Sequence, residues 1–252
     1  MKPKRIESIS DLPDESFFDE ISLGYEKILK NALQLDEDAS LLKTNRRPSC
    51  RILSKIAEEE AAKCLILLDA VRCPHNMLKS HLKKFSDHIA KGVYAESCYW
   101  SPRDFEEFKI YVEDEKKREF VDGPSGVEYV FKNNRIMWDR EENMYVDYIE
   151  TDDGKFVWLT PSMSKNSLPD MAEALFLSQS FHLAGCTSPV ALKQISDFWK
   201  SVVIKPETTL FELTKINHQM LKFLDEKGLL KHQSENIYTA IANSWSFPMF
   251  SL

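Results

Sequence analysis

The chain has 252 residues, of which 43% are hydrophobic and 29% charged, and its formal net charge is -7. This hydrophobic content is enough to bury a core in one large domain or two small ones, so general disorder is excluded. The net negative charge argues against broad nucleic-acid affinity, because most of that affinity comes from neutralising phosphates. With only 7 glycines and many helix-forming residues, the composition favours a mainly α protein over a β-sandwich or barrel.

The cysteines indicate a reducing compartment. Their number is odd and none is in a CxxC motif, so we expect free thiols: Cys50, Cys64, Cys73, Cys98 and Cys186. No secretory leader opens the sequence, and no apolar run reaches the roughly 20 residues of a membrane helix. We therefore expect a cytoplasmic protein with no membrane partner.

The N-terminal part predicts a flexible lead-in over residues 1–15, followed by a long amphipathic helix. Ser16 is a candidate N-cap, and apolar residues recur at helical spacing from Phe17 to about Lys43. This helix should pack against the next one.

The segment from Ser49 to Ala70 predicts the second helix, with one apolar stripe: Leu53, Ile56, Ala57, Cys64, Leu67 and Leu68. Glu60 falls in the middle of that stripe. A buried carboxylate needs a partner, because removing its water costs several kcal/mol. Lys63 lies one turn on, so Glu60 is interpreted either as part of a structural polar knot or as part of a working site.

A basic corner separates the first two helices. Between Asp38 and Glu58 all charged residues are basic, and Pro48 interrupts the run. Two interpretations remain open, a solvated corner or a patch that binds phosphate or RNA, and the candidate residues are Arg46, Arg47, Arg51 and Lys55, with Lys43.

A third helix is expected over residues 76–95, after Pro74. His81 and His88 adjoin its apolar side, and each is followed three residues later by a lysine, Lys91 in the case of His88. Seven residues separate the histidines by roughly 10 Å, too far for one metal ion, so no metal site is predicted. Either histidine is a candidate donor to Glu60.

Residues 101–165 predict an insertion with a small β-hairpin. A charged helix over 105–118 leads to the turn residues Asp122-Gly123-Pro124, and two β-prone runs, 144–149 and 155–159, flank Asp153-Gly154. Arg140 precedes the first run, and its guanidinium suits a buried carboxylate.

Residues 166–252 return to helical patterns. Helices are expected over 170–184, 190–203 and 210–226, the last closed by Gly228. The end of the chain is rich in apolar residues and should dock on the fold or on a partner. We therefore expect a helical core over 16–100, the insertion over 101–165 and a C-terminal helical part over 166–252 packed on the core.

Nucleotide-loop, dinucleotide, hydrolase-elbow and zincin motifs are absent from the sequence, and no cofactor is predicted. The remaining candidate for chemistry is a polar centre of ionisable residues: Glu59, Glu60, Lys63, His81, His88, Lys91 and Arg140.

Four segments in order resemble the AbiV-type abortive infection proteins, a branch of the HEPN-like helical bundles. They are the EE-x-x-K helix at 56–63, the His-x-x-Lys helix at 87–96, the DGP turn at 121–124 and the RE-x-x-x-YVD segment at 140–148. The resemblance covers about residues 20–162. It implies a HEPN-like helical bundle, here with a small β-hairpin insertion and additional C-terminal helices.

The resemblance also implies a cytoplasmic bacterial antiphage protein that forms a homodimer. Many HEPN-like relatives are metal-independent ribonucleases with an Arg-x(4-6)-His motif. This chain departs from that motif, because Arg72 is too close to His75 and too far from His81, and no other arginine precedes a histidine at that spacing.

Two hypotheses follow, and whether the protein is an enzyme stays open. In the first, the chain senses a phage protein and arrests growth or macromolecular synthesis, and the polar centre holds the bundle together. In the second, it cleaves RNA, with His88 as general acid and base and Lys91 or Arg140 steadying the phosphate. A small-molecule enzyme is a third class without a residue signal.

Overall fold

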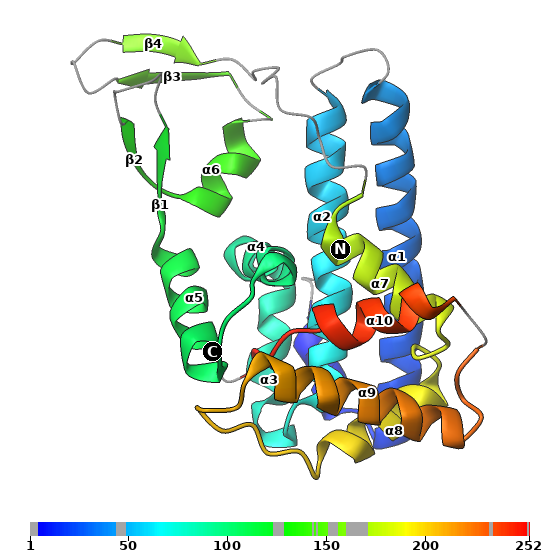
Figure 1. Ribbon diagram of the computed structural model, residues 1–252. Coiled ribbons are helices and arrows are strands. Elements are labelled where there is room, and N and C mark those ends of the chain that lie inside the picture. The colour runs from blue at the N-terminus through cyan, green and yellow to red at the C-terminus, as the bar shows by residue number, and fades with distance from the viewer. Residues whose placement is uncertain are drawn as a thin grey trace.

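Two long helices, α1 (Asp14–Lys43) and α2 (Ser49–Arg72), lie side by side and form the axis of the fold (Figure 1). The computed structural model describes residues 5–43, 49–122, 129–142, 144, 146–150, 156–159, 171–231, 234–250 and 252. The helical pattern of α1 places Phe17, Ile21 and Tyr25 in the core. The prediction of a mainly α fold is confirmed.

The second half of α2 is buried on all sides. Every residue from Leu65 to Arg72 is buried, because α2 packs against α1, α4, α7 and α8. A helix surrounded in this way shows no single apolar stripe. Burial along α2 therefore does not follow the stripe predicted from the sequence.

The predicted third helix is divided into three pieces. They are α3 (His75–Leu82), the 3-10 turn η2 (Lys83–Ser86) and α4 (His88–Glu96). Asp87 has extended backbone and caps α4, since its carboxylate accepts from the backbone N–H groups of Ile89 and Ala90. Because of this break, α4 is a separate helix that does not continue α3.

The middle of the chain adds a helix that the sequence pattern did not predict. After η3 (Ser97–Tyr99) and α5 (Phe105–Lys117), strand β1 (Glu119–Asp122) pairs antiparallel with β2 (Tyr129–Asn134). Helix α6 (Arg135–Glu142) follows and contacts α4. Strand β3 (Asp147–Glu150) then pairs antiparallel with β4 (Phe156–Leu159), and these strands overlap the two β-prone runs 144–149 and 155–159. The residues between them, 151–155, lie outside the described residues.

Four helices complete the fold: α7 (Glu173–Leu183), α8 (Pro189–Trp199), α9 (Leu210–Glu226) and α10 (Glu235–Ser244). Thr209 forms a capping box with Glu212 at the start of α9, and Gly228 follows its end at a φ of 67°. Trp245, Phe247 and Met249 are buried beyond α10, so the C-terminal segment docks on its own fold.

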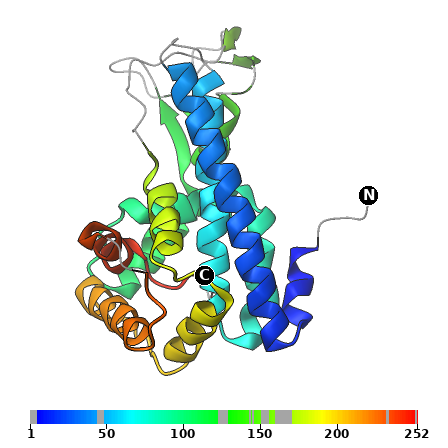
Figure 2. The same ribbon diagram turned by 90° about the vertical axis from the view of Figure 1, so that its right-hand side faces the viewer.

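Part of the predicted lead-in, residues 6–11, is helical. Within the expected lead-in, Ile6–Asp11 form the 3-10 helix η1, and Ile6 and Ile9 pack against the core. Figure 2 shows η1 on the opposite side of α1 from α7, α9 and α10. The polar sequence predicted a flexible segment here, but the apolar contacts of these two isoleucines hold it against the core.

Candidate functional site

Glu59, in the first half of α2, is the carboxylate on which cationic side chains converge. Its side chain is 12% exposed. Lys91 donates to Glu59 Oε2 over 2.6 Å, and His88 Nδ1 lies 3.0 Å from the same oxygen. Arg140 contributes from α6, with Nε 3.2 Å from Oε1 of Glu59. We call Glu59, His88, Lys91 and Arg140 the Glu59 cluster.

The cap at Asp87 explains why two members of the cluster come from one short helix. His88 is the first residue of α4 and Lys91 is three residues later, so they share one face of the helix. That face is directed at α2. Figure 1 shows α4 and α6 on the same side of α2, which brings the third cation within reach.

The electrostatics of the Glu59 cluster favour an ionised carboxylate. Burial by itself raises the pKa of Glu59, but the hydrogen bond and charge of Lys91, together with His88, outweigh burial and hold that pKa below its usual value. Lys91 is only 5% exposed. Its ammonium group therefore depends on Glu59 as a counter-ion.

His88 occupies a position between an anion and a cation. Its Nδ1 lies 3.0 Å from Glu59 Oε2 and 3.1 Å from Lys91 Nζ. An Nδ1–H donates to the carboxylate, whereas a bare Nδ1 accepts from the ammonium group, so the tautomer decides which bond forms. The side chain is 37% exposed and is the most accessible of the cluster.

The expectation that Glu60 gathers these cations is corrected. Glu60 pairs with Lys63 within α2, and Lys63 lies 5.4 Å from the centre of the Phe85 ring. Neighbouring residues on a helix point about 100° apart, so Glu59 and Glu60 face different surroundings. Since α2 packs on several sides, its sequence pattern did not distinguish which glutamate faces α4.

The basic corner is only partly within the described residues. Arg46 and Arg47 lie outside them, as does the side chain of Lys43. Arg51 and Lys55 are half-buried on the first turns of α2. Lys55 donates to Glu58 over 2.7 Å, which engages part of the predicted positive charge.

A second polar cluster, missed in the sequence, lies at the other end of α2. Asp69 is 1% exposed and accepts from Arg72 Nε at 2.7 Å, Tyr94 OH at 2.6 Å and the backbone N–H of Met249 at 2.8 Å. Arg72 also donates to the carbonyl of Ser246. The signal was an acidic residue in the apolar run LILLDAVR with an arginine three residues later.

Two further basic side chains, Lys84 and His81, lie near Asp69. Lys84 donates to the carbonyls of Met249 and Leu252, and burial lowers its pKa despite the nearby carboxylate of Asp69. His81 is fully buried, donates through Nε2 to the carbonyl of Ile66, and has its pKa lowered chiefly by burial. These contacts fix the C-terminal segment and give His81 a structural role away from Glu59.

The thiols have the environments of structural cysteines. All five are free, as the sequence predicts. Burial raises the pKa of Cys73 and of Cys186 to about 12 in each case, and raises that of Cys64 further. A thiol with a raised pKa forms little of the thiolate that acts as a nucleophile.

The described residues contain neither a group of side chains suited to a metal ion nor a helix suited to a membrane. Among them, no three His, Cys, Asp or Glu side chains are grouped so that they could hold a metal ion. No helix in the described part of the chain combines the length and the apolar character needed to cross a membrane.

Comparison with known proteins identifies the family. The AbiV family model of HEPN-type domains matches residues 20–175, which include α2, α4 and α6 and therefore the whole Glu59 cluster. No curated protein and no solved structure gives a significant match to the chain. Because the match extends over more than half of its length, the chain belongs to the AbiV family of HEPN-type proteins.

Proposed function

We propose that this chain is an abortive infection protein that senses a phage product and then arrests growth or macromolecular synthesis. The observation that carries the proposal is the AbiV family match over residues 20–175, since that family is linked to antiphage defence. We place the protein in the bacterial cytoplasm as a homodimer whose trigger is a phage protein.

The geometry of the Glu59 cluster supports a structural role for it within that function. Lys91 is 5% exposed and its ammonium group already bonds to Glu59, so a phosphate would have to displace the carboxylate to reach it. Arg140 is engaged by the other oxygen of Glu59. Both cations therefore serve to join α4 and α6 to α2.

The test is a phage challenge of a bacterial host that expresses the chain. We expect fewer plaques and smaller bursts, with infected cells that fail to recover, as abortive infection requires. His88→Ala should keep this protection, because His88 is partly exposed and the buried pair of Lys91 and Glu59 remains. Unchanged plaque counts and burst sizes across a broad phage panel would argue against a defence function.

RNA cleavage is the second candidate, and one observation favours it. His88 is 37% exposed, its Nδ1 lies 3.1 Å from Lys91 Nζ, and Arg140 binds the Glu59 carboxylate that His88 also contacts, an arrangement suited to proton transfer next to a phosphate. Purified protein would be incubated with total bacterial RNA, with and without phage lysate, and the RNA then sized. Cleavage that is lost in His88→Ala at an unchanged melting temperature would support the ribonuclease and contradict a purely structural cluster.

A further inference from the structure

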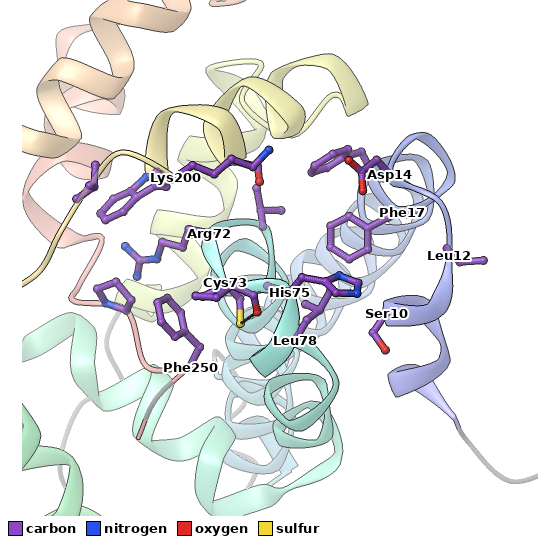
Figure 3. Close-up of a pocket in the computed structure, with 18 of the residues that line it drawn as sticks. Ser10, Leu12, Asp14, Phe17, Arg72, Cys73, His75, Leu78, Lys200 and Phe250 are labelled. Atoms are coloured by element: carbon purple, nitrogen blue, oxygen red, sulfur yellow. Dashed lines mark hydrogen bonds between the residues drawn. The ribbon is translucent and has the colours of Figure 1, made fainter.

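A cavity of about 370 Å³ lies at the C-terminal end of α2 (Figure 3). Its wall is built from the start of α1, the end of α2, the end of α8 and the C-terminal segment. Arg72 in this wall is thirteen residues beyond Glu59, which is about 20 Å along a helix. The cavity is therefore separate from the Glu59 cluster, and its volume is in the range of small-molecule sites.

Most of the wall is apolar. The large apolar side chains that form it include Phe17, Leu78, Trp199, Val202, Ile204 and Phe250. An apolar cavity of about 150 Å³ holds one benzene ring, so this space suits a molecule with one or two rings.

Two buried N–H donors in the wall lack a partner. Arg72 Nη1 and Trp199 Nε1 are enclosed and have no hydrogen-bond acceptor among the described residues. Arg72 Cζ lies 4.8 Å from the centre of the Trp199 ring and 4.1 Å from that of Trp245, so the guanidinium is stacked beside the indole that carries the second donor. The Arg72 side chain is 1% exposed, and leaving such a donor unpaired costs free energy that a ligand acceptor would recover.

The charges around the cavity favour a neutral acceptor over an anion. Arg72 is neutralised by Asp69, and Lys200 pairs with Asp197 at 2.7 Å. Asp14 adds a negative charge to the wall. An anion would therefore meet an acidic side chain and two cations that already have partners.

We propose that this cavity binds a small, flat, uncharged molecule that carries a carbonyl group. Its rings fill the space between Phe17, Leu78 and Phe250, and its carbonyl oxygen accepts from Arg72 Nη1 and Trp199 Nε1. The rings supply apolar contact and the two donors supply orientation.

The first test compares three probes of similar size: benzamide, toluene and benzoate. The readout is the indole N–H resonance of Trp199, assigned by its absence in Trp199→Phe. Benzamide should shift this resonance saturably and bind about tenfold more tightly than toluene or benzoate, because it offers an uncharged acceptor. The absence of a saturable shift at about 20 mM benzamide, equal affinity for toluene, or tighter binding of benzoate would each overturn the proposal.

The second test uses a matched pair of leucine variants, one within α8 and one just after it. Ser196 lines the cavity, whereas Ser201 is exposed and outside it. Ser196→Leu should weaken benzamide at least tenfold by filling space, and Ser201→Leu should leave binding unchanged. Trp199→Phe lacks the reporter resonance, so its binding is followed on the ligand signals; it should weaken benzamide about threefold to tenfold and leave toluene unaffected. Equal binding to both leucine variants would overturn the site, and if Trp199→Phe fails to fold, titrations of the leucine pair with the three probes, followed on the ligand signals, still decide.

Discussion

The ammonium group of Lys91, almost fully buried in α4, lies 2.6 Å from the carboxylate of Glu59 in α2. The two residues are 32 positions apart, so this contact holds one helix of the bundle against another. Arg140 extends the arrangement to α6 through the second oxygen of the same carboxylate. A single side chain thus connects three elements of the AbiV domain.

Replacing Glu59 should therefore destabilise the fold more than replacing its neighbour. Glu59→Gln leaves Lys91 and Arg140 without a counter-ion, and we expect a loss of about 1 to 3 kcal/mol in the free energy of unfolding. Glu60→Gln removes a partly exposed pair on one helix and should cost less than about 0.5 kcal/mol. Urea unfolding followed by circular dichroism measures both, and equal losses would contradict the assignment of Glu59.

The contribution of Glu59 should also depend on pH. Its pKa is lower in the folded state than in the unfolded chain, where a glutamate titrates at about 4.3. The stabilisation is therefore fully present above that value and is lost as the pH falls through the folded pKa. Wild type should exceed Glu59→Gln in stability at pH 7, and the difference should shrink as the pH is lowered from about 4.5 to 3. A difference that stays constant over this range would show that the carboxylate is not held ionised.

His81 should act in a different pH window. Burial lowers its pKa in the folded state, whereas in the unfolded chain it titrates at about 6.5. The unfolded state then binds the proton more readily, so stability is present above about pH 6.5 and falls as the pH drops below it. His81→Gln, compared with wild type between pH 7.5 and 5 by urea unfolding, should flatten this part of the curve. The same slope in both proteins would contradict a buried neutral His81.

The C-terminal segment should depend on Lys84. Lys84→Met removes the donor to the carbonyls of Met249 and Leu252, so the backbone N–H of Met249 should exchange with solvent faster. Lys83→Met is the matched control, because Lys83 is exposed and next in sequence. We expect at least tenfold faster exchange in the first variant only, since about 1.4 kcal/mol of local stability corresponds to a factor of ten. Equal exchange rates in the two variants would mean that contacts other than those of Lys84 hold the C-terminal segment in place.

The sequence predicted elements whose signals are local. The sequence located α9 at its observed bounds and α1 at its last residue, because caps and apolar spacing act over one or two turns. The start of α1 was missed by three residues, since the helix begins at Asp14 and Ser16 lies inside it. The break at Asp87 was missed although it is also local, since an aspartate inside an apolar-periodic segment has no unique meaning without the direction of its side chain.

The polar residues of the site were predicted as a set, but their pairing was not. His88, Lys91 and Arg140 do converge on one glutamate, yet that glutamate is Glu59. Choosing between adjacent residues requires knowing where α4 and α6 lie around α2, and α6 itself was not predicted. Asp69 and Arg72 were missed for the same reason, because their partners in the C-terminal segment, Met249 and Ser246, are 180 and 174 residues away.

The most direct test of the Glu59 cluster is a double-mutant cycle between Glu59 and Lys91. Unfolding free energies would be measured for wild type, Glu59→Gln, Lys91→Met and the double variant at pH 7. If the buried pair joins α2 to α4, the two single losses are not additive and the coupling is at least about 1 kcal/mol. A coupling below about 0.3 kcal/mol would mean that the two side chains act independently, and it would contradict the account.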